Sequence, residues 1–308
     1  MKRLLFRRRF LRYQGGHGKV WDYYRHAAAH PHWRVAIHLT GDSIAQGNPW
    51  AGAGMSGSYV PWEPQRHDAL FLAGLDWQAW PRDDDALPVI NLIQGLRHAQ
   101  PDDPAHAYLS RRALRICVSQ PVADAILATG MVRGPVQVIP AALVLPQTLP
   151  SDTRRGILID ATKQPQAGAQ LAVVLQAQGH APRLLDASVP RQDYLQALAA
   201  CEIAVLLPYP AEGFYLPALE AMALGCAVVV PDCVGNRAYL RPEHNALTPA
   251  ATVDALAAAT TRLAADAPLR ARLVQAGIET ATAFSQAAER TAFHRLLDDL
   301  PALWRDSA

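Results

Sequence analysis

The chain has 308 residues, with 29 basic against 27 acidic side chains and a hydrophobic fraction of 50%. This near-neutral charge excludes a nucleic-acid binder that works through a broad basic field, and the apolar content is too high for a disordered chain. At ~100–200 residues per domain, the length predicts two domains.

The cysteines and the N-terminal segment favour a reducing, cytoplasmic setting. Three arginines break the apolar stretch that a signal peptide would need, and no window reaches the ~18–20 apolar residues of a membrane span. We therefore expect a cytoplasmic protein, with any membrane contact peripheral and at the inner face. No disulfide framework or zinc site is expected, because neither CxxC nor Cys/His spacing connects Cys117, Cys201, Cys226 and Cys233.

Strands alternate with helices in the first half, a pattern typical of parallel sheets covered on both faces. An arginine-rich first strand is expected within 3–12, then a glycine-rich loop at 15–19 and a helix over 20–30. An irregular segment over 41–67 interrupts the alternation. The other expected elements are a helix at 122–129 and strands at 34–39, 69–73, 89–93, 114–118 and 136–140.

A run rich in Pro, Ser and Thr at 145–152 has the composition of a domain linker. Beyond it, strands are expected at 156–160, 183–185, 203–207 and 227–230, and helices at 166–179, 192–200, 217–224 and 286–300. The sequence thus predicts an α/β protein with two Rossmann-like halves facing across a cleft, in which ligands bind at the carboxyl ends of the strands.

The stretch Pro208 to Gly225 carries the most chemical information. Glu212 lies in a turn after a buried strand, and Pro217 stands where a helix opens. The free amides and the dipole of that helix suit a phosphate. Glu220 lies about one turn into the helix and leans toward its N-terminus, where a carboxylate accepts hydrogen bonds from ribose or sugar hydroxyls. An ordinary strand–turn–helix with two surface glutamates is the alternative.

This stretch strongly resembles the E-x7-E segment of the retaining glycosyltransferases of family 4, which have the two-lobed GT-B fold. The similarity continues through 227–232 and 235–240, reaches back to 118–120 and 138–140, and covers roughly residues 114–300. It implies an acceptor-side domain at 1–147, a nucleotide-sugar-binding domain at 148–285, and a final helix at 286–308 that packs back on the first domain.

The resemblance also implies roles for single residues. Glu220 would bind the ribose hydroxyls of the donor, and Glu212, in a catalytic role, would face the transferred sugar. Val189 lies where backbone groups would recognise the base. The diphosphate would meet the backbone amides of Phe214, Tyr215 and Leu216 at the start of the helix, and Gly213 is a further donor-binding residue there.

Lys163 follows the expected strand 156–160, where the family has a Gly-Arg pair and then a lysine that neutralises the leaving diphosphate. This chain lacks the Gly-Arg pair, but Thr162 and Lys163 remain. The resemblance gives Lys163 a catalytic role and places Thr162 in the donor site. An ordinary solvated lysine is the alternative.

The glycine-rich segment 15–19 allows its backbone to approach a phosphate or sugar. In the resembled family the corresponding first-lobe loop closes over the donor. That position favours donor binding by Gly15, Gly16, His17 and Lys19. A plain glycine-rich turn between strand and helix is the alternative.

The expected strand 89–93 ends in polar and basic residues. Gln94 stands where the family has a histidine that contacts the donor sugar, and His98 follows four residues later. We therefore take His98 as a catalytic candidate and Arg97 as an acceptor-binding one, with surface positions as the alternative.

Four of the seven tryptophans lie between residues 50 and 80. Indole faces stack on sugars, so Trp50 and Trp62 are acceptor-binding candidates, and core packing is an equal alternative. Asp83–Asp85 contains a DxD, the metal motif of the other glycosyltransferase fold, but it lies in a polar turn. No metal site and no cofactor are expected.

The expected activity is retaining transfer of a sugar from a nucleotide diphosphate donor, of UDP or GDP type, to a hydroxyl acceptor. The acceptor is a glycan, a lipid-linked sugar or a small molecule, and no nucleic acid takes part. One alternative is a GT-B sugar-nucleotide epimerase or donor hydrolase. Another is a non-catalytic sugar- or partner-binding protein, because Ala141-Ala142-Leu143 replaces the usual Asn-Gly-Ile of the family.

Overall fold

The computed structural model describes residues 1–12, 15–52, 59–80, 86–145 and 154–306. It divides into two compact units, one of Met1–Ala141 with Ala287–Ala308 and one of Ala142–Gln286. The predicted linker lies almost wholly outside the described residues, and so does the DxD at Asp83–Asp85. In the described part of the chain, no helix has the length and apolar character to cross a membrane.

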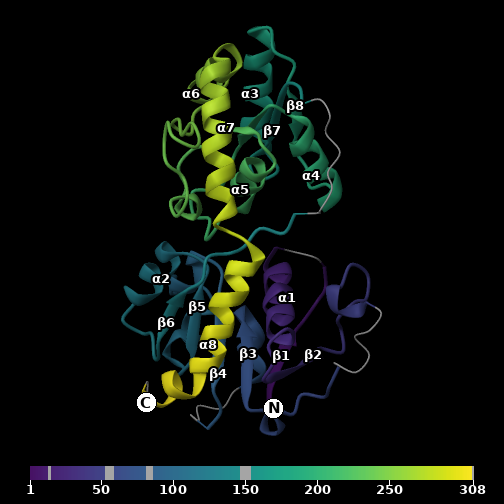
Figure 1. The fold of residues 1–308 in the computed structure, drawn as a ribbon, viewed down its shortest axis with the longest axis vertical. Helices are drawn as coiled ribbons and strands as arrows, with labels where there is room; N and C mark the ends of the chain where they lie inside the picture. The colour runs from purple at the N-terminus through teal and green to yellow at the C-terminus, as the bar shows by residue number, and fades with distance from the viewer. Residues whose placement is uncertain (13–14, 53–58, 81–85, 146–153, 307–308) are drawn as a thin grey trace. The chain divides into compact units, whose positions relative to one another are not determined.

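The first unit is built on a six-stranded parallel sheet (Figure 1) in the order β2-β1-β3-β4-β5-β6. Its helices are α1 (Gly15–Ala28), α2 (Gln120–Leu127) and α8 (Gln286–Asp306). The chain runs from β1 through α1 to β2 on one side and then continues at β3 on the other, so the strand order reverses at β1. The strands are β1 (Lys2–Arg8), β2 (Trp33–Leu39), β3 (Ala69–Ala73), β4 (Val89–Ile93), β5 (Leu114–Cys117) and β6 (Val136–Val138).

Aromatic side chains join the sheet of the first unit to two helices. Phe71 of β3 stacks on Phe6 of β1, with ring centroids 4.5 Å apart. The same ring contacts Tyr23 of α1 at 5.5 Å and Phe293 of α8 at 6.1 Å. Helices α1 and α8, which are far apart in sequence, therefore cover one face of this sheet together (Figure 1).

Helix α1 begins at Gly15, so the prediction of a glycine loop at 15–19 was wrong in its secondary structure. Tertiary contacts outweigh the poor helix propensity of glycine here. Lys19 Nζ lies 2.8 Å from Asp22 and 2.9 Å from Glu289 of α8, and Glu289 also lies 2.9 Å from His26. All four side chains are buried, and their mutual pairing fixes α1 against α8.

The second unit is built on a four-stranded parallel sheet in the order β10-β9-β7-β8. Its strands are β7 (Ile157–Asp160), β8 (Arg183–Leu185), β9 (Ile203–Leu206) and β10 (Ala227–Val229). The strand order reverses at β7, which leads through α3 to β8 on one side and pairs with β9 on the other. Its helices are α3 (Pro165–Ala177), α4 (Arg191–Ala200), α5 (Leu216–Ala223), α6 (Val253–Ala265) and α7 (Ala267–Thr282).

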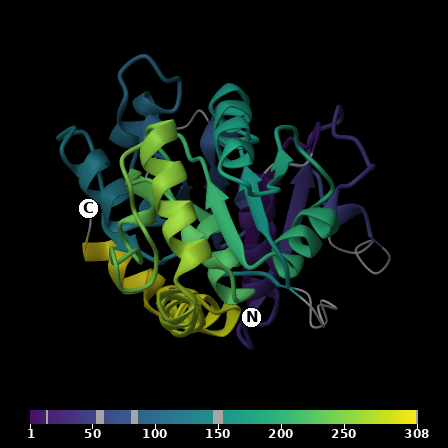
Figure 2. The same cartoon turned by 90° about the horizontal axis from the view of Figure 1, so that it is seen from above.

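The strands of the second unit are buried on both faces. In β9, Ala204 and Leu206 belong to a core cluster that contains residues of α4 and α5. The alternate residues, Ile203 and Val205, belong to a second cluster with residues of α3 and α6. This division follows from the two-residue repeat of a strand, and Figure 2 shows helices on both sides of these strands. A sheet covered in this way leaves its strand ends for binding.

Candidate functional site

The loop after β7 is shaped by Asp160, the last residue of that strand. Its Oδ1 accepts hydrogen bonds from the amide of Thr162 at 3.1 Å and from the hydroxyl of Thr162 at 2.8 Å. Its Oδ2 accepts from the hydroxyl of Tyr194 at 3.0 Å. Thr162 thus closes the turn on Asp160, and Lys163 follows it at the point where the strand order reverses.

Lys163 forms an ion pair with Glu212, which lies in the loop after β9. Its ammonium also lies 5.0 Å from the ring centroid of Tyr215 and 6.0 Å from that of Tyr209, within the range of cation–π attraction. The Lys163 side chain is 33% exposed and that of Glu212 17%. These contacts exclude the alternative of an ordinary solvated lysine, and they bring two predicted catalytic residues together.

Two further contacts hold the Glu212 loop in place. Gln164 donates to the carbonyl of Pro208 at 2.5 Å, which ties the loop after β7 to the loop after β9. On the other side, Gly235 of the 3₁₀ helix η6 (Val234–Asn236) approaches so closely that a Cβ there would lie 2.8 Å from Glu212 Cβ and 2.9 Å from its carbonyl oxygen. Only glycine fits this approach without displacing Glu212.

The start of α5 places the predicted diphosphate residues beside Glu212. The first-turn amides of any helix lack intrahelical partners, and Gly213, Phe214 and Leu216 lie at this end of α5. The amide of Tyr215, however, donates to the carbonyl of Gly235 at 3.0 Å. The expectation that this amide meets a diphosphate was therefore wrong, because it is used to hold the η6 loop.

Glu220 is buried in α5, with 2% of its surface exposed. Its Oε1 lies 2.5 Å from Nη2 of Arg191, the first residue of α4. Its Oε2 is buried and makes no hydrogen bond to the described residues. The alternative of two surface glutamates is thereby excluded. A buried carboxylate oxygen without a donor costs free energy, so this atom is suited to receive a hydroxyl from a ligand.

Arg191 is a site residue that the sequence reasoning missed. It is 46% exposed, and it fixes the orientation of the Glu220 carboxylate. Val189, predicted to lie near the base, is exposed two residues earlier in the same loop. The sequence predicted that the segment around Val189 lies near the donor. No motif, however, connects Arg191 with Glu220, which follows 29 residues later.

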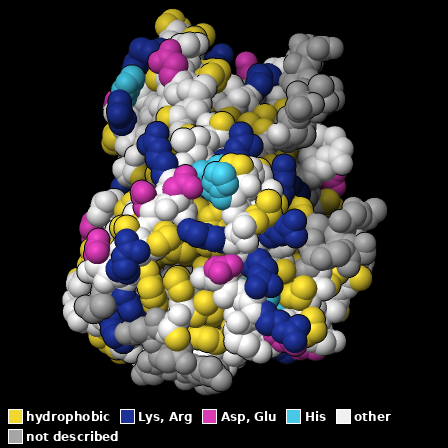
Figure 3. Space-filling model, turned by 60° about the horizontal axis from the view of Figure 1, so that its bottom comes forward, with side chains coloured by type: hydrophobic (Ala, Val, Ile, Leu, Met, Phe, Trp, Pro, Cys, Tyr) yellow, Lys and Arg dark blue, Asp and Glu magenta, His cyan; other side chains and the backbone are white. Residues whose placement is uncertain are grey.

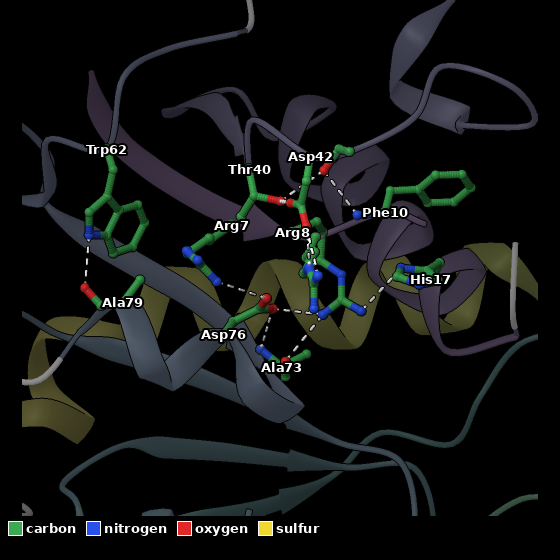
Figure 4. A network of polar contacts seen from close by, with 12 residues as sticks. Arg7, Arg8, Phe10, His17, Thr40, Asp42, Trp62, Ala73, Asp76 and Ala79 are labelled. Carbon is green, nitrogen blue, oxygen red and sulfur yellow. Dashed lines mark hydrogen bonds and ion pairs between the residues drawn. The ribbon is translucent and has the colours of Figure 1, made fainter. Parts of the chain in front are cut away.

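The strand end of β1 in the first unit carries a second cluster of charged side chains (Figure 4). Arg8 Nη1 donates to Asp76 Oδ2 at 2.6 Å and to the carbonyl of Ala73 at 3.1 Å. Its Nη2 lies 3.1 Å from Nδ1 of His17 in the first turn of α1. Burial, and then the charge of Arg8, lower the pKa of His17 to about 4. His17 is therefore neutral at physiological pH.

The remaining residues of the predicted glycine segment differ in their surroundings. Gly15 is exposed, and the carbonyl of Gly16 accepts a hydrogen bond from Gln94 Nε2 at 3.2 Å. Lys19 is 5% exposed and lies between two carboxylates. The prediction that Lys19 binds the donor was wrong, because its charge is already neutralised inside the unit.

His98 and Arg97 lie in the 3₁₀ helix η4 (Leu96–Ala99) after β4, in different environments. His98 is buried, with Nδ1 3.1 Å from the carbonyl of Gly95 and Nε2 without a partner among the described residues. His98 is therefore not the surface residue of the alternative, and its burial lowers its pKa. Arg97 is 65% exposed, and its guanidinium lies beside Gly74 at the end of β3.

The two tryptophan candidates, Trp50 and Trp62, differ in burial. Trp50 is fully buried and packs edge-on against Trp21, with ring centroids 5.6 Å apart. The prediction that Trp50 binds the acceptor was wrong, because its faces are covered by core residues. Trp62 is half-buried, donates from Nε1 to the carbonyl of Ala79 at 2.9 Å, and lies 5.9 Å from the guanidinium of Arg7.

On the face drawn in Figure 3, Lys and Arg side chains are scattered among apolar and neutral ones. Among the residues that the structure describes, no group of three or more His, Cys, Asp or Glu side chains is arranged to hold a metal ion.

Comparisons with solved structures establish the fold. The sucrose-phosphate synthase of Thermosynechococcus elongatus aligns with a TM-score of 0.70 and 17% identity over 98% of this chain and 100% of that one. HepE of Anabaena, solved with UDP and glucose, aligns with a TM-score of 0.73 and 14% identity, covering 97% and 100%. The chain has a GT-B fold. A putative UDP-N-acetylglucosamine 2-epimerase of Listeria monocytogenes aligns with a TM-score of 0.67 and 10% identity, covering 96% of each chain.

Sequence comparison finds similarity to a known family over part of the second unit. The family model of group 1 glycosyl transferases matches residues 156–266, the part of the second unit that contains Lys163, Glu212 and Glu220. No curated protein matches the sequence. The matched segment and the GT-B fold together support a glycosyltransferase.

Proposed function

We propose that the protein is a retaining, metal-independent glycosyltransferase of the E-x7-E type that uses a nucleotide diphosphate sugar. The observation that carries this proposal is Glu220, whose buried Oε2 accepts no hydrogen bond from the residues that the structure describes. A ribose offers hydroxyl donors to such an oxygen, and a phosphate offers none. HepE, which has the same fold, is a protein solved with UDP-glucose.

The charged groups of the second unit are suited to stabilise a diphosphate as it leaves the sugar. This group gains negative charge as the glycosidic bond breaks, so donors that are fixed in advance stabilise the transition state. Lys163 and the first-turn amides of α5 supply such donors. A lysine ammonium has three N–H groups, so Lys163 can remain paired with Glu212 while it donates to a phosphate oxygen.

Retention follows if the acceptor hydroxyl attacks from the face that the diphosphate leaves. The diphosphate then accepts the hydroxyl proton, and no enzyme nucleophile is required. Glu212 is held beside Lys163, and we propose that it faces the transferred sugar. A reaction of this kind needs no divalent cation, because Lys163 and the helix amides carry the charge compensation.

Product analysis tests the proposal. The purified protein is incubated with UDP- and GDP-sugars, with and without a panel of hydroxyl acceptors and with a chelator present. We expect a new glycoside that retains the anomeric configuration of the donor, formed only with acceptor. Inverted product or strict dependence on manganese would contradict the proposal.

The same experiment addresses an epimerase or donor hydrolase, the second candidate. This candidate is supported by one of the structural neighbours, a putative UDP-N-acetylglucosamine 2-epimerase. Turnover to an epimer or a free sugar without acceptor would favour it over transfer.

A further inference from the structure

Arg7, near the end of β1, has hydrogen-bonding groups that the described residues do not use. Its side chain is 17% exposed, and its Nη1 lies 3.6 Å from Asp76 Oδ1, beyond hydrogen-bond distance. Its Nε is buried with no partner among the described residues. A guanidinium carries five N–H donors, and withdrawing them from water unpaired costs free energy. Because the guanidinium is partly exposed, its N–H groups can also donate to an acceptor from outside the chain.

The two neighbouring carboxylates, Asp76 and Asp42, already accept hydrogen bonds from other arginines. Asp76 Oδ2 accepts from Arg8 at 2.6 Å and from the amide of Ala73 at 3.1 Å (Figure 4). Asp42 accepts from Arg9 at 2.7 Å and from the hydroxyl of Thr40. Because Arg7 and Arg8 share the single carboxylate of Asp76, the cluster keeps a net positive charge.

His17 adds a neutral donor to the same cluster. A guanidinium only donates, so Nδ1 of His17 must accept from Arg8 Nη2 at 3.1 Å. The ring proton then resides on Nε2, which is a hydrogen-bond donor. His17 belongs to the first turn of α1, where the helix dipole also favours negative charge.

The cluster occupies the position in its sheet where ligands of α/β proteins bind. Arg7 and Arg8 end β1, the strand at which the order of the first unit reverses, and Asp76 follows β3 on the other side of that reversal. Such a switch point is where ligands bind outside the carboxyl ends of the strands.

We propose that Arg7, Arg8 and His17 form an oxyanion site, and that the acceptor of the transfer carries a phosphate or carboxylate group that binds there. The identification of this ligand as the acceptor rests on the proposed function. Arg7 contributes N–H donors that form no hydrogen bond with the described residues, Arg8 is held by Asp76 as a fixed charge, and His17 adds its Nε2–H.

The test is calorimetric titration of the full chain, saturated with UDP so that the second unit is filled, with glucose 6-phosphate, glucuronate and glucose. We expect an acidic sugar to bind and glucose not to bind, and the acidic sugar that binds identifies the anion. Arg7→Gln should weaken that binding about ten-fold or more. Arg9→Gln is the matched control, because it removes the same charge two residues later, from a side chain that is 61% exposed.

A second variant keeps the test decisive if Arg7→Gln does not fold. Arg7→Lys retains the charge but loses the planar fork, so we expect weaker oxyanion binding than in the wild type. Equal affinity for glucose and the acidic sugars, or equal losses in Arg7→Gln and Arg9→Gln, would overturn the oxyanion site. Retained UDP affinity in Arg7→Gln separates this inference from the proposed function. Failure of the wild type to bind UDP would overturn only the proposed function. The titration with acidic sugars would then be run without UDP.

Discussion

At the residue scale, Glu220 and Lys163 of the second unit differ in burial and in pairing. Glu220 is buried and turned by Arg191, with one oxygen left for a donor. Lys163 is one-third exposed and paired with Glu212. A buried, oriented carboxylate favours affinity for a fixed partner. An ammonium held in place by Glu212 and still partly exposed can donate to a charge that develops during reaction.

Replacing Lys163 tests that assignment. Lys163→Met removes the ammonium and keeps much of the apolar stem, so we expect kcat for sugar transfer to fall about 100-fold or more, as for the loss of a preorganised donor. Lys2→Met is the matched control, because Lys2 is an exposed lysine of the first unit. Equal kcat values for the two variants in a steady-state assay would remove Lys163 from the catalytic step.

The positions of site residues were predictable where local sequence determines them. Glu212, Glu220 and Lys163 follow strands or open a helix, and the resemblance to the E-x7-E segment grouped them, while their roles stay predictions. Arg191, Gly235 and Asp76 were missed because their partners come from other loops and only the folded sheet brings them together. Trp50 was wrongly predicted to be a binding residue, because composition alone does not distinguish a tryptophan of the core from one that stacks on a sugar.

At the scale of elements, the loops after β7, β9 and β10 form one packed assembly in the second unit. Gln164 holds the carbonyl of Pro208, and the carbonyl of Gly235 holds the amide of Tyr215. The position of Glu212 therefore depends on a glycine in a loop to which it is not adjacent in sequence.

A methyl group at position 235 should reveal this dependence. Gly235→Ala places a Cβ 2.8 to 2.9 Å from Glu212 and the Tyr215 amide, so Glu212 must shift. We expect a loss of about 1–3 kcal/mol in the free energy of unfolding and weaker UDP binding. Gly41→Ala, where nothing lies within 4 Å of the added carbon, is the control. Denaturant unfolding and calorimetry measure both effects, and equal behaviour of the two variants would contradict the packing described.

The helices and strands themselves were largely predictable. Apolar runs such as Ala69–Ala73 and Val89–Ile93 coincide with β3 and β4 as expected, because strands buried on both faces need continuous apolar residues. The start of α1 was not predictable, since glycine disfavours a helix and the contact between Lys19 and Glu289 joins distant parts of the chain. Long-range ion pairs leave no periodic signal in a sequence.

Across the whole molecule, several histidines have lowered pKa values, which makes stability depend on pH. Burial lowers the pKa of His17 to about 4, and burial also lowers those of His30 and His98. In the unfolded chain a histidine titrates near 6.5. Between these values the unfolded state binds more protons than the folded state, so stability present above pH 6.5 is lost as the pH falls toward 4.

Thermal unfolding as a function of pH checks this expectation. The melting temperature of the wild type should fall between pH 7 and pH 5, and the fall should be smaller in His17→Gln, which cannot take up the proton. His67→Gln is the control, because His67 is a half-buried histidine of the same unit with no role in the cluster of Arg8. A wild-type melting temperature that rises on acidification would contradict the linkage.

The most direct test of the account is the affinity of the full chain for UDP and GDP, measured by calorimetry on the wild type, Glu220→Gln and Glu279→Gln. Glu279 is exposed on α7 and provides the same change of charge. We expect the wild type and Glu279→Gln to bind one of the nucleotides alike, and Glu220→Gln to bind it about ten-fold more weakly or worse. Wild-type protein that binds neither nucleotide, or Glu220→Gln with undiminished affinity, would contradict it.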